Sequence, residues 1–230
     1  MSLPYFLAAD PLTGVIEGAE AQHAHVTRVA PGERIMLFDG HGLTAEVEVT
    51  EASKQRVAGT VVAHRVEAAP APRVTVVQAI PKSERAELAV DLAVQAGADA
   101  IVPWISHRTI ARWPDTKRDK QLEKWRNQAL ASAKQARRAW VPEVGDVVTS
   151  TQLGGADTQK LVLHEDAETS IKDVEFAAEV LLVVGPEGGI SAEELELIGG
   201  TPVKLGPEVL RTASAAFAGL CAIGALTKRW

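Results

Sequence analysis

Two glycine-bearing turns near the C-terminus carry the strongest chemical signal in this sequence. Residues 181–191 read Leu-Leu-Val-Val-Gly-Pro-Glu-Gly-Gly-Ile-Ser, and residues 203–212 read Val-Lys-Leu-Gly-Pro-Glu-Val-Leu-Arg-Thr. In each stretch an apolar run typical of a strand leads into Gly-Pro-Glu and then into a helical pattern. Ser191 and Glu194 have the spacing of a capping box, which predicts a helix start. We therefore expect two neighbouring strands to end in loops at one edge of a sheet.

The first turn is suited to a ligand that lies directly against the backbone. Gly185, Gly188 and Gly189 have no side chains and can adopt positive φ, while Pro186 stiffens the loop and has no N–H to satisfy. The Walker sequence Gly-Lys-Ser/Thr and the dinucleotide pattern Gly-x-Gly-x-x-Gly are both missing. Glu187 would also repel phosphate. These residues favour a neutral or cationic ligand, such as a nucleoside carrying a sulfonium.

Taken together, the two turns resemble the paired cofactor loops of the SPOUT class of RNA methyltransferases. Within that class the chain is similar to the family that methylates N3 of a uridine in 16S ribosomal RNA. Residues 81–85 (Pro-Lys-Ser-Glu-Arg), 135–143 (Gln-Ala-Arg-Arg-Ala-Trp-Val-Pro-Glu) and 163–165 (Leu-His-Glu) stand where that family has its other motifs. The resemblance therefore covers nearly the whole chain.

The resemblance implies S-adenosyl-L-methionine as the cofactor, gripped by the backbone of three loops. It also implies a deep trefoil knot in the C-terminal domain and a homodimer whose interface contains the site. The cofactor-binding residues that it indicates are Leu163, His164, Glu165, Val184, Gly185, Pro186, Glu187, Gly188, Leu205, Gly206, Leu210, Arg211 and Thr212.

Two catalytic residues follow from the same resemblance. Arg138 falls on the first arginine of the family motif, and its forked N–H donors could hold the anion that forms over O2 and O4 of the uridine. Glu187 could accept the N3 proton or hold the cationic cofactor, and the sequence leaves both roles open. Trp140 replaces the second arginine of the motif, and Leu92 replaces a lysine that relatives carry. Expected RNA contacts are Arg28, Lys82, Arg85, Arg108, Lys124, Arg137 and Arg138.

Charge is distributed unevenly along the chain. The net charge of the 230 residues is −6, which by itself argues against a nucleic-acid partner. Between Arg108 and Arg138, however, ten basic residues face only three acidic ones, a local excess of +7. A basic surface on an acidic protein could bind RNA phosphates, so 16S ribosomal RNA within the small subunit remains the expected partner.

The elements that must position these residues fall into two predicted domains. Residues 1–68 contain three strand patterns, at 34–38, 43–49 and 56–66, which predict a small β-barrel. The resemblance identifies it as a PUA-like or OB-like RNA-binding domain. A proline-containing linker at 68–72 precedes alternating strand and helix patterns over residues 73–230. That alternation predicts an α/β domain with a mostly parallel sheet.

Several negative features narrow the class of protein. No apolar run approaches the ~20 residues that span a bilayer, and the N-terminus lacks an export signal, so we expect a cytoplasmic protein and no membrane partner. His23 and His25 lack cysteines or paired carboxylates nearby, so we expect no metal. The alternatives are methylation of a ribose 2′-O or of guanine N1, a non-catalytic RNA-binding module and, least favoured, a nucleotide hydrolase.

Overall fold

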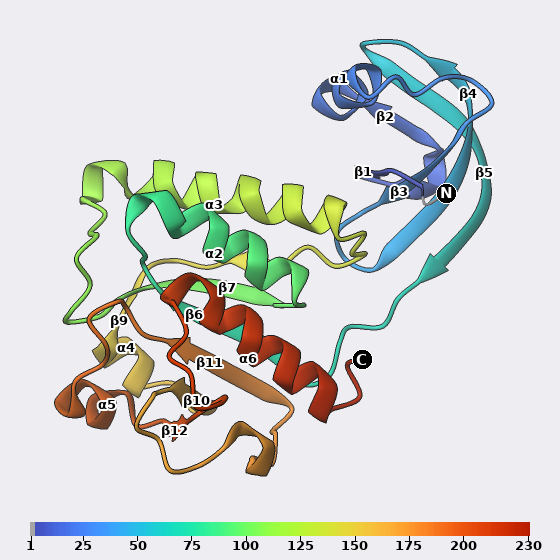
Figure 1. Cartoon of the computed structure of the whole chain (residues 1–230). Helices are drawn as coiled ribbons and strands as arrows, with labels where there is room; N and C mark the ends of the chain where they lie inside the picture. Colours follow the sequence, from blue (N-terminus) through green and yellow to red (C-terminus); the bar gives the residue numbers. More distant parts are fainter. Residues whose placement is uncertain (1–2) are drawn as a thin grey trace. The chain divides into compact units, whose positions relative to one another are not determined.

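The computed structural model describes residues 3–230, apart from the side chains of Ser83 and Glu84, and these residues form two compact units. Unit 1 contains the chain up to Ala69 together with Ala133–Val141, and unit 2 contains Pro70–Ser132 and Pro142–Trp230. The segment that follows the long basic helix therefore packs with the N-terminal part of the chain. Figure 1 shows the elements of both units.

Unit 1 is a five-stranded sheet with one short helix. Its strands are β1 (Tyr5–Leu7), β2 (Val15–Glu17), β3 (Arg34–Phe38), β4 (Leu43–Ala52) and β5 (Arg56–Val66), in the order β1-β3-β4-β5-β2. A 3₁₀ turn, η1 (Pro11–Thr13), and the helix α1 (Gly18–Val26) complete it. All neighbours pair antiparallel except β1 and β3. The three predicted strands are confirmed, and β4 continues beyond its predicted end.

Alternating side chains build the core of unit 1. Ile35 and Leu37 from β3 and Val47 and Val49 from β4 are all buried, as period-two strands with one covered face require. Residues 133–141 are attached to this unit by polar contacts. Lys134 forms an ion pair with Glu20 at 2.8 Å, and the indole N–H of Trp140 donates to the carbonyl of Glu67 at 3.0 Å.

Unit 2 is built on a seven-stranded sheet in which every pairing is parallel. The strands are β6 (Arg73–Ala79), β7 (Ala100–Ile105), β8 (Glu143–Val144), β9 (Val148–Thr149), β10 (Gln159–Leu163), β11 (Glu179–Val184) and β12 (Thr201–Val203). The helices are α2 (Ser83–Gln95), α3 (Asp115–Gln135), α4 (Ser150–Gly154), α5 (Ala192–Ile198) and α6 (Thr212–Leu226), with a 3₁₀ turn η2 (Ile171–Asp173). The predicted α/β domain with a parallel sheet is confirmed.

Helices cover both faces of this sheet. On one face Val77, Trp104 and Val183 pack with Leu153 of α4 and Ile198 of α5. On the other face α2 packs against α6, and α6 contacts β6 and β11, as Figure 1 shows for the red helix. Strands enclosed in this way must be apolar on both sides, which explains the nearly continuous apolar run in β6.

The strand order corrects one expectation. The order is β12-β10-β11-β6-β7-β8, so β10 lies between the two strands that were predicted to be neighbours. Because β10, β11 and β12 are parallel, their C-terminal ends still share one edge of the sheet. The two turns are close in sequence, which indicated that β11 and β12 are neighbours in the sheet. The earlier strand β10 instead lies between β11 and β12. The trefoil knot stays a prediction from the resemblance.

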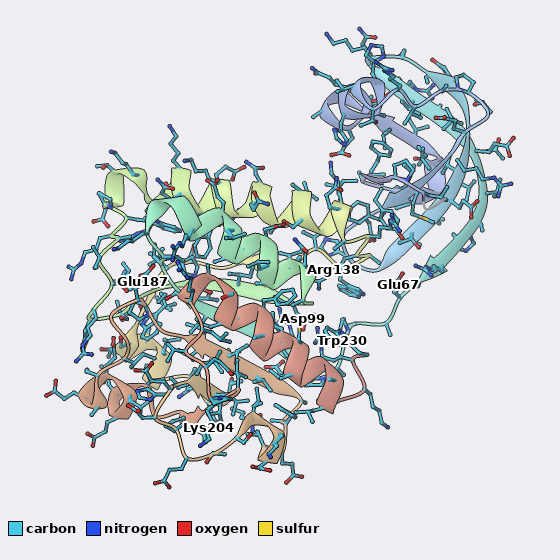
Figure 2. All side chains as sticks on the ribbon, in the orientation of Figure 1. Glu67, Asp99, Arg138, Glu187, Lys204 and Trp230 are labelled. Carbon is cyan, nitrogen blue, oxygen red and sulfur yellow. The ribbon has the colours of Figure 1, made fainter. Side chains whose placement is uncertain are left out.

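The C-terminus is fixed by a buried ion pair. The guanidinium of Arg229 lies 2.7 Å from the Asp99 carboxylate and also donates to the carbonyls of Pro72 and Gly97. Trp230 packs beside Gly224 of α6. Figure 2 shows Asp99 and Trp230 near each other and away from Glu187. Over residues 3–230, no helix is both long enough and apolar enough to cross a membrane.

Candidate functional site

A cavity of about 820 Å³ lies at the C-terminal ends of β10, β11 and β12. Its walls come from the segments that follow these strands and from the first turns of α5 and α6. All thirteen residues predicted to hold the cofactor line it. Ligands of parallel α/β sheets generally bind at this edge, beyond the carboxyl ends of the strands. Figure 2 labels Glu187 and Lys204, which follow β11 and β12.

The loop between β11 and α5 forms one wall of the cavity. The amide of Gly189 donates to the carbonyl of Pro186 at 2.9 Å, and Gly189 has a φ of +70°. A Cβ on Gly185 would lie 2.8 Å from Cγ1 of Ile190, which is itself buried. The loop therefore needs glycine both for its conformation and for its close packing.

The loop after β10 occupies the middle of the site. The backbone N–H of His164 donates to the carbonyl of Val203 at 3.0 Å, which joins this loop to the end of β12. The amide of Asp166 donates to Nδ1 of His164 at 3.2 Å, so this nitrogen is the acceptor of the ring. The bond to Val203 fixes two neighbouring walls of the cavity relative to each other, and the bond from Asp166 orders the loop itself.

Charged side chains of both signs surround the cavity. Its lining includes four carboxylates and four cationic side chains. Such a mixture is poorly matched to a polyphosphate but suits a ligand that carries charges of both signs. The carboxylates are Glu165, Asp166, Glu187 and Glu208, and the cations are Arg85, Arg108, Lys204 and Arg211.

Two predicted RNA contacts of unit 2 also touch the cofactor loop. Nη1 of Arg108 donates to the carbonyl of Gly188 at 3.1 Å. The backbone N–H of Lys82 lies 3.5 Å from Oε1 of Glu187. Arg85 lines the same cavity. The structure thus brings these three residues together with the predicted cofactor loop.

The remaining predicted RNA contacts lie elsewhere in the chain. Lys124 is exposed on α3, in unit 2. Arg28 and Arg137 are exposed and Arg138 is half-buried, and all three belong to unit 1. Their roles, including the catalytic role of Arg138, stay predictions.

Glu194 corrects the predicted capping box. The hydroxyl of Ser191 accepts from the backbone N–H of Glu194 at 3.2 Å, as a cap requires. The Glu194 side chain does not reach back to Ser191. Its Oε1 instead accepts from the amide of His107 and from the hydroxyl of Ser150. Burial explains the difference, because these donors from other elements need an acceptor.

Sequence reasoning missed several residues that line the cavity. Asp166, Lys204 and Glu208 follow or lie within the predicted loops, so the same motifs could have included them. Ala215 was also missed, although Thr212 at the start of the same helix was predicted to hold the cofactor.

The chain matches known proteins along its whole length. Residues 68–224 match the family described as RNA methyltransferase domain, and residues 16–62 match the RNA methyltransferase PUA domain. Ribosomal RNA small subunit methyltransferase E of Mycobacterium tuberculosis is 41% identical over 246 residues, covering 100% of this chain and 94% of that protein. The protein of the same name from Bacillus subtilis is 30% identical over 230 residues, covering 93% of this chain and 90% of its own length.

A solved structure gives the same result for the fold. Ribosomal RNA small subunit methyltransferase E from Neisseria gonorrhoeae, bound to S-adenosyl methionine, superposes with a TM-score of 0.88 at 26% identity and covers 98% of both chains. The fold is therefore that of the SPOUT methyltransferases preceded by a PUA-like domain. On these matches the chain belongs to the RNA methyltransferase family that includes ribosomal RNA small subunit methyltransferase E.

Proposed function

We propose that this protein uses S-adenosyl-L-methionine to methylate N3 of a uridine in 16S ribosomal RNA of the small ribosomal subunit. The observation that carries the proposal is the cavity at the ends of β10, β11 and β12, lined by every residue expected to hold the cofactor. The names of the relatives supply the class of target, which is ribosomal RNA of the small subunit.

The residues present fit this cofactor. A volume of about 820 Å³ accommodates a nucleoside with an amino-acid tail. Gly185 and Gly188 line the cavity, and their missing side chains let Ile190 and Arg108 pack against the loop. The mixed charges of the lining suit a sulfonium, an ammonium and a carboxylate in one ligand. When bound, S-adenosyl-L-methionine supplies a methyl group that the sulfonium makes electrophilic.

The protein's own groups have three tasks in this reaction. The loops at 163–165, 184–188 and 205–212 hold the cofactor and orient it for an in-line displacement. Arg138 stabilises the negative charge on O2 and O4 of the uridine as N3 loses its proton. Glu187 either accepts that proton or interacts with the cationic cofactor.

RNA binding involves cationic residues of both units. Lys82 and Arg108 are proposed to contact phosphate groups near the site, and Arg85 to contact the RNA beside them. Lys124 lies on the basic helix α3, and Arg28 and Arg137 are exposed in unit 1. Their contacts with phosphate would give an affinity that falls steeply with salt.

We also propose that the protein is a cytoplasmic homodimer. The homodimer follows from the resemblance, and an interface would cover exposed apolar side chains such as Val209 in the loop after β12 and Phe217 on α6, which are 74% and 37% exposed. Light scattering coupled to size exclusion would give twice the chain mass of 24.5 kDa. A mass of one chain would contradict the homodimer.

Mass spectrometry of ribosomal RNA tests the activity. Small-subunit RNA from cells lacking this protein should lose one N3-methyluridine, and the purified protein with S-adenosyl-L-methionine should restore it. A missing ribose or guanine methyl group would instead identify another target position. Thermal shift should show stabilisation by S-adenosyl-L-methionine, ~2.7 kcal/mol at 100 times its Kd, and none by ATP or GTP.

A further inference from the structure

Glu194 is a buried carboxylate at the start of α5, the helix that follows the loop after β11. It is fully buried, at 0% exposure, in the first turn of α5. Its Oε1 accepts a hydrogen bond from the backbone N–H of His107 at 2.7 Å and another from the hydroxyl of Ser150 at 2.6 Å. The Ser150 hydroxyl in turn accepts from the indole N–H of Trp104 at 3.1 Å. One oxygen atom therefore joins α5 to α4 and to the segment after β7.

The segment after β7 also contacts the cofactor loop itself. Arg108, which follows His107, donates from Nη1 to the carbonyl of Gly188 at 3.1 Å. Its Cβ also lies 3.2 Å from the position that a Cβ on Gly188 would occupy. The pair His107 and Arg108 thus contacts both the loop and the helix that follows it.

This arrangement limits the conformations open to the loop. One end of the loop is held by β11, which pairs with strands on both sides. The other end is held where Glu194 binds His107, and the middle is held by Arg108. A loop that is already ordered loses less conformational entropy when a ligand binds, and this increases affinity.

We propose that Glu194 is a positioning residue for the cofactor loop. By accepting the N–H of His107 it fixes the segment after β7 against α5, and Arg108 on that segment then holds Gly188 in its cofactor-binding conformation. Within the described structure, Glu194 does not line the cavity, so it acts through these neighbours. The inference rests on the proposed function, since the ligand is S-adenosyl-L-methionine.

Lys160 of β10 provides a matched structural control, because its side chain links the same two helices. It is 8% exposed, and its Nζ donates to the carbonyls of Gly154 at 3.2 Å and Ile198 at 3.1 Å. These carbonyls belong to the last residues of α4 and α5, whereas Ser150 and Glu194 belong to their first turns. Lys160→Met therefore removes a buried polar link between the same helices at the ends away from the loop.

Isothermal titration with S-adenosyl-L-methionine, well below each variant's Tm, tests the proposal. Glu194→Ala should raise the Kd about tenfold, which corresponds to ~1.4 kcal/mol. Glu194→Gln keeps an oxygen acceptor and should bind within about twofold of the wild type. Lys160→Met should lower the Tm but leave the Kd unchanged.

Two results would overturn the positioning role. One is an unchanged Kd for folded Glu194→Ala, and the other is equal losses for the Gln and Ala variants, which would mean that the charge matters rather than the acceptor. If Glu194→Ala does not fold, Arg108→Ala carries the test. Arg108 is exposed, and in Arg108→Ala without ligand the backbone amides of residues 185–191 should exchange hydrogen faster than in the wild type. An unchanged exchange rate would refute the proposal. A wild type that does not bind S-adenosyl-L-methionine would refute the proposed function instead.

Discussion

Helices end with the same backbone motif in both units, but the residue at positive φ in this motif is glycine in unit 2 and arginine in unit 1. At the end of α2, in unit 2, the amide of Gly97 donates to the carbonyl of Val94 at 3.0 Å, and the amide of Ala98 donates to that of Ala93 at 2.9 Å. This pair of bonds is the Schellman motif, which places one residue at positive φ. Here that residue is Gly97, at +99°.

Unit 1 repeats both bonds with arginine in place of glycine. Arg28 follows α1 at a φ of 64°, and Arg137 follows α3 at 55°. Within residues 3–230 they are the non-glycine residues with positive φ. The bonds are Arg28 N to His25 O (3.1 Å), Val29 N to Ala24 O (2.9 Å), Arg137 N to Lys134 O (3.2 Å) and Arg138 N to Ala133 O (2.9 Å).

The difference matches the roles predicted for these helix ends. A side chain at positive φ costs ~1 kcal/mol or more relative to glycine. At Gly97 a Cβ would lie at an ordinary contact distance, 3.5 Å, from Nη2 of the buried Arg229, so positive φ is what favours glycine there. Arg28 and Arg137 are exposed, and both are predicted RNA contacts. We propose that the contacts of their charges with RNA offset the cost of the backbone strain.

The largest effect on stability is expected when arginine, the residue type found at this position of the motif in unit 1, replaces glycine in unit 2. Gly97→Arg should lower the free energy of unfolding by about 2 kcal/mol, because it combines positive φ with a second cation beside Arg229. Urea unfolding of the full chain measures this. Gly97→Asn, which tolerates this backbone better, should lose less. If Gly97→Arg unfolds like the wild type, positive φ carries no cost here and the comparison fails.

The reverse exchange should separate stability from function. Arg28→Gly and Arg137→Gly should each raise the free energy of unfolding by about 1 kcal/mol, since glycine relieves the strain. Each should also weaken binding to small-subunit RNA and reduce the slope of log K against log salt by about 1, for one lost phosphate contact. Filter binding at several salt concentrations gives both values. Stabilised variants with unchanged RNA affinity would refute the inferred role.

The smallest effect should come from exchanging one cation for another. Arg28→Lys keeps the charge and the non-glycine backbone, so the free energy of unfolding should change by less than about 0.5 kcal/mol. RNA affinity should also stay close to that of the wild type, because a phosphate contact accepts either cation. A large loss of affinity would mean that the guanidinium itself is required, as in a bidentate contact.

Local patterns predicted much of the fold, and the resemblance to the SPOUT class supplied most of the site residues. The strand at 56–66 was predicted with its observed bounds because alternation and turn residues are local signals. The two Gly-Pro-Glu turns were predicted as loops at one edge of the sheet, and both line the cavity there.

Local sequence patterns did not predict the arrangements that involve residues far apart in the chain. The insertion of β10 between β11 and β12 depends on how the whole sheet assembles. The partners of Glu194 are His107 and Ser150, 87 and 44 residues away in sequence, so its spacing from Ser191 suggested only a local cap. The strained backbone at Arg28 likewise carries no mark in the sequence, because arginine is uncommon at such a position.

A crystal structure of the protein grown with S-adenosyl-L-methionine tests the central claim most directly. The account predicts one cofactor molecule per chain, in the cavity between the loops at 163–166, 184–190 and 203–212. Density for the cofactor at another place, or an empty cavity at a saturating concentration, would contradict it.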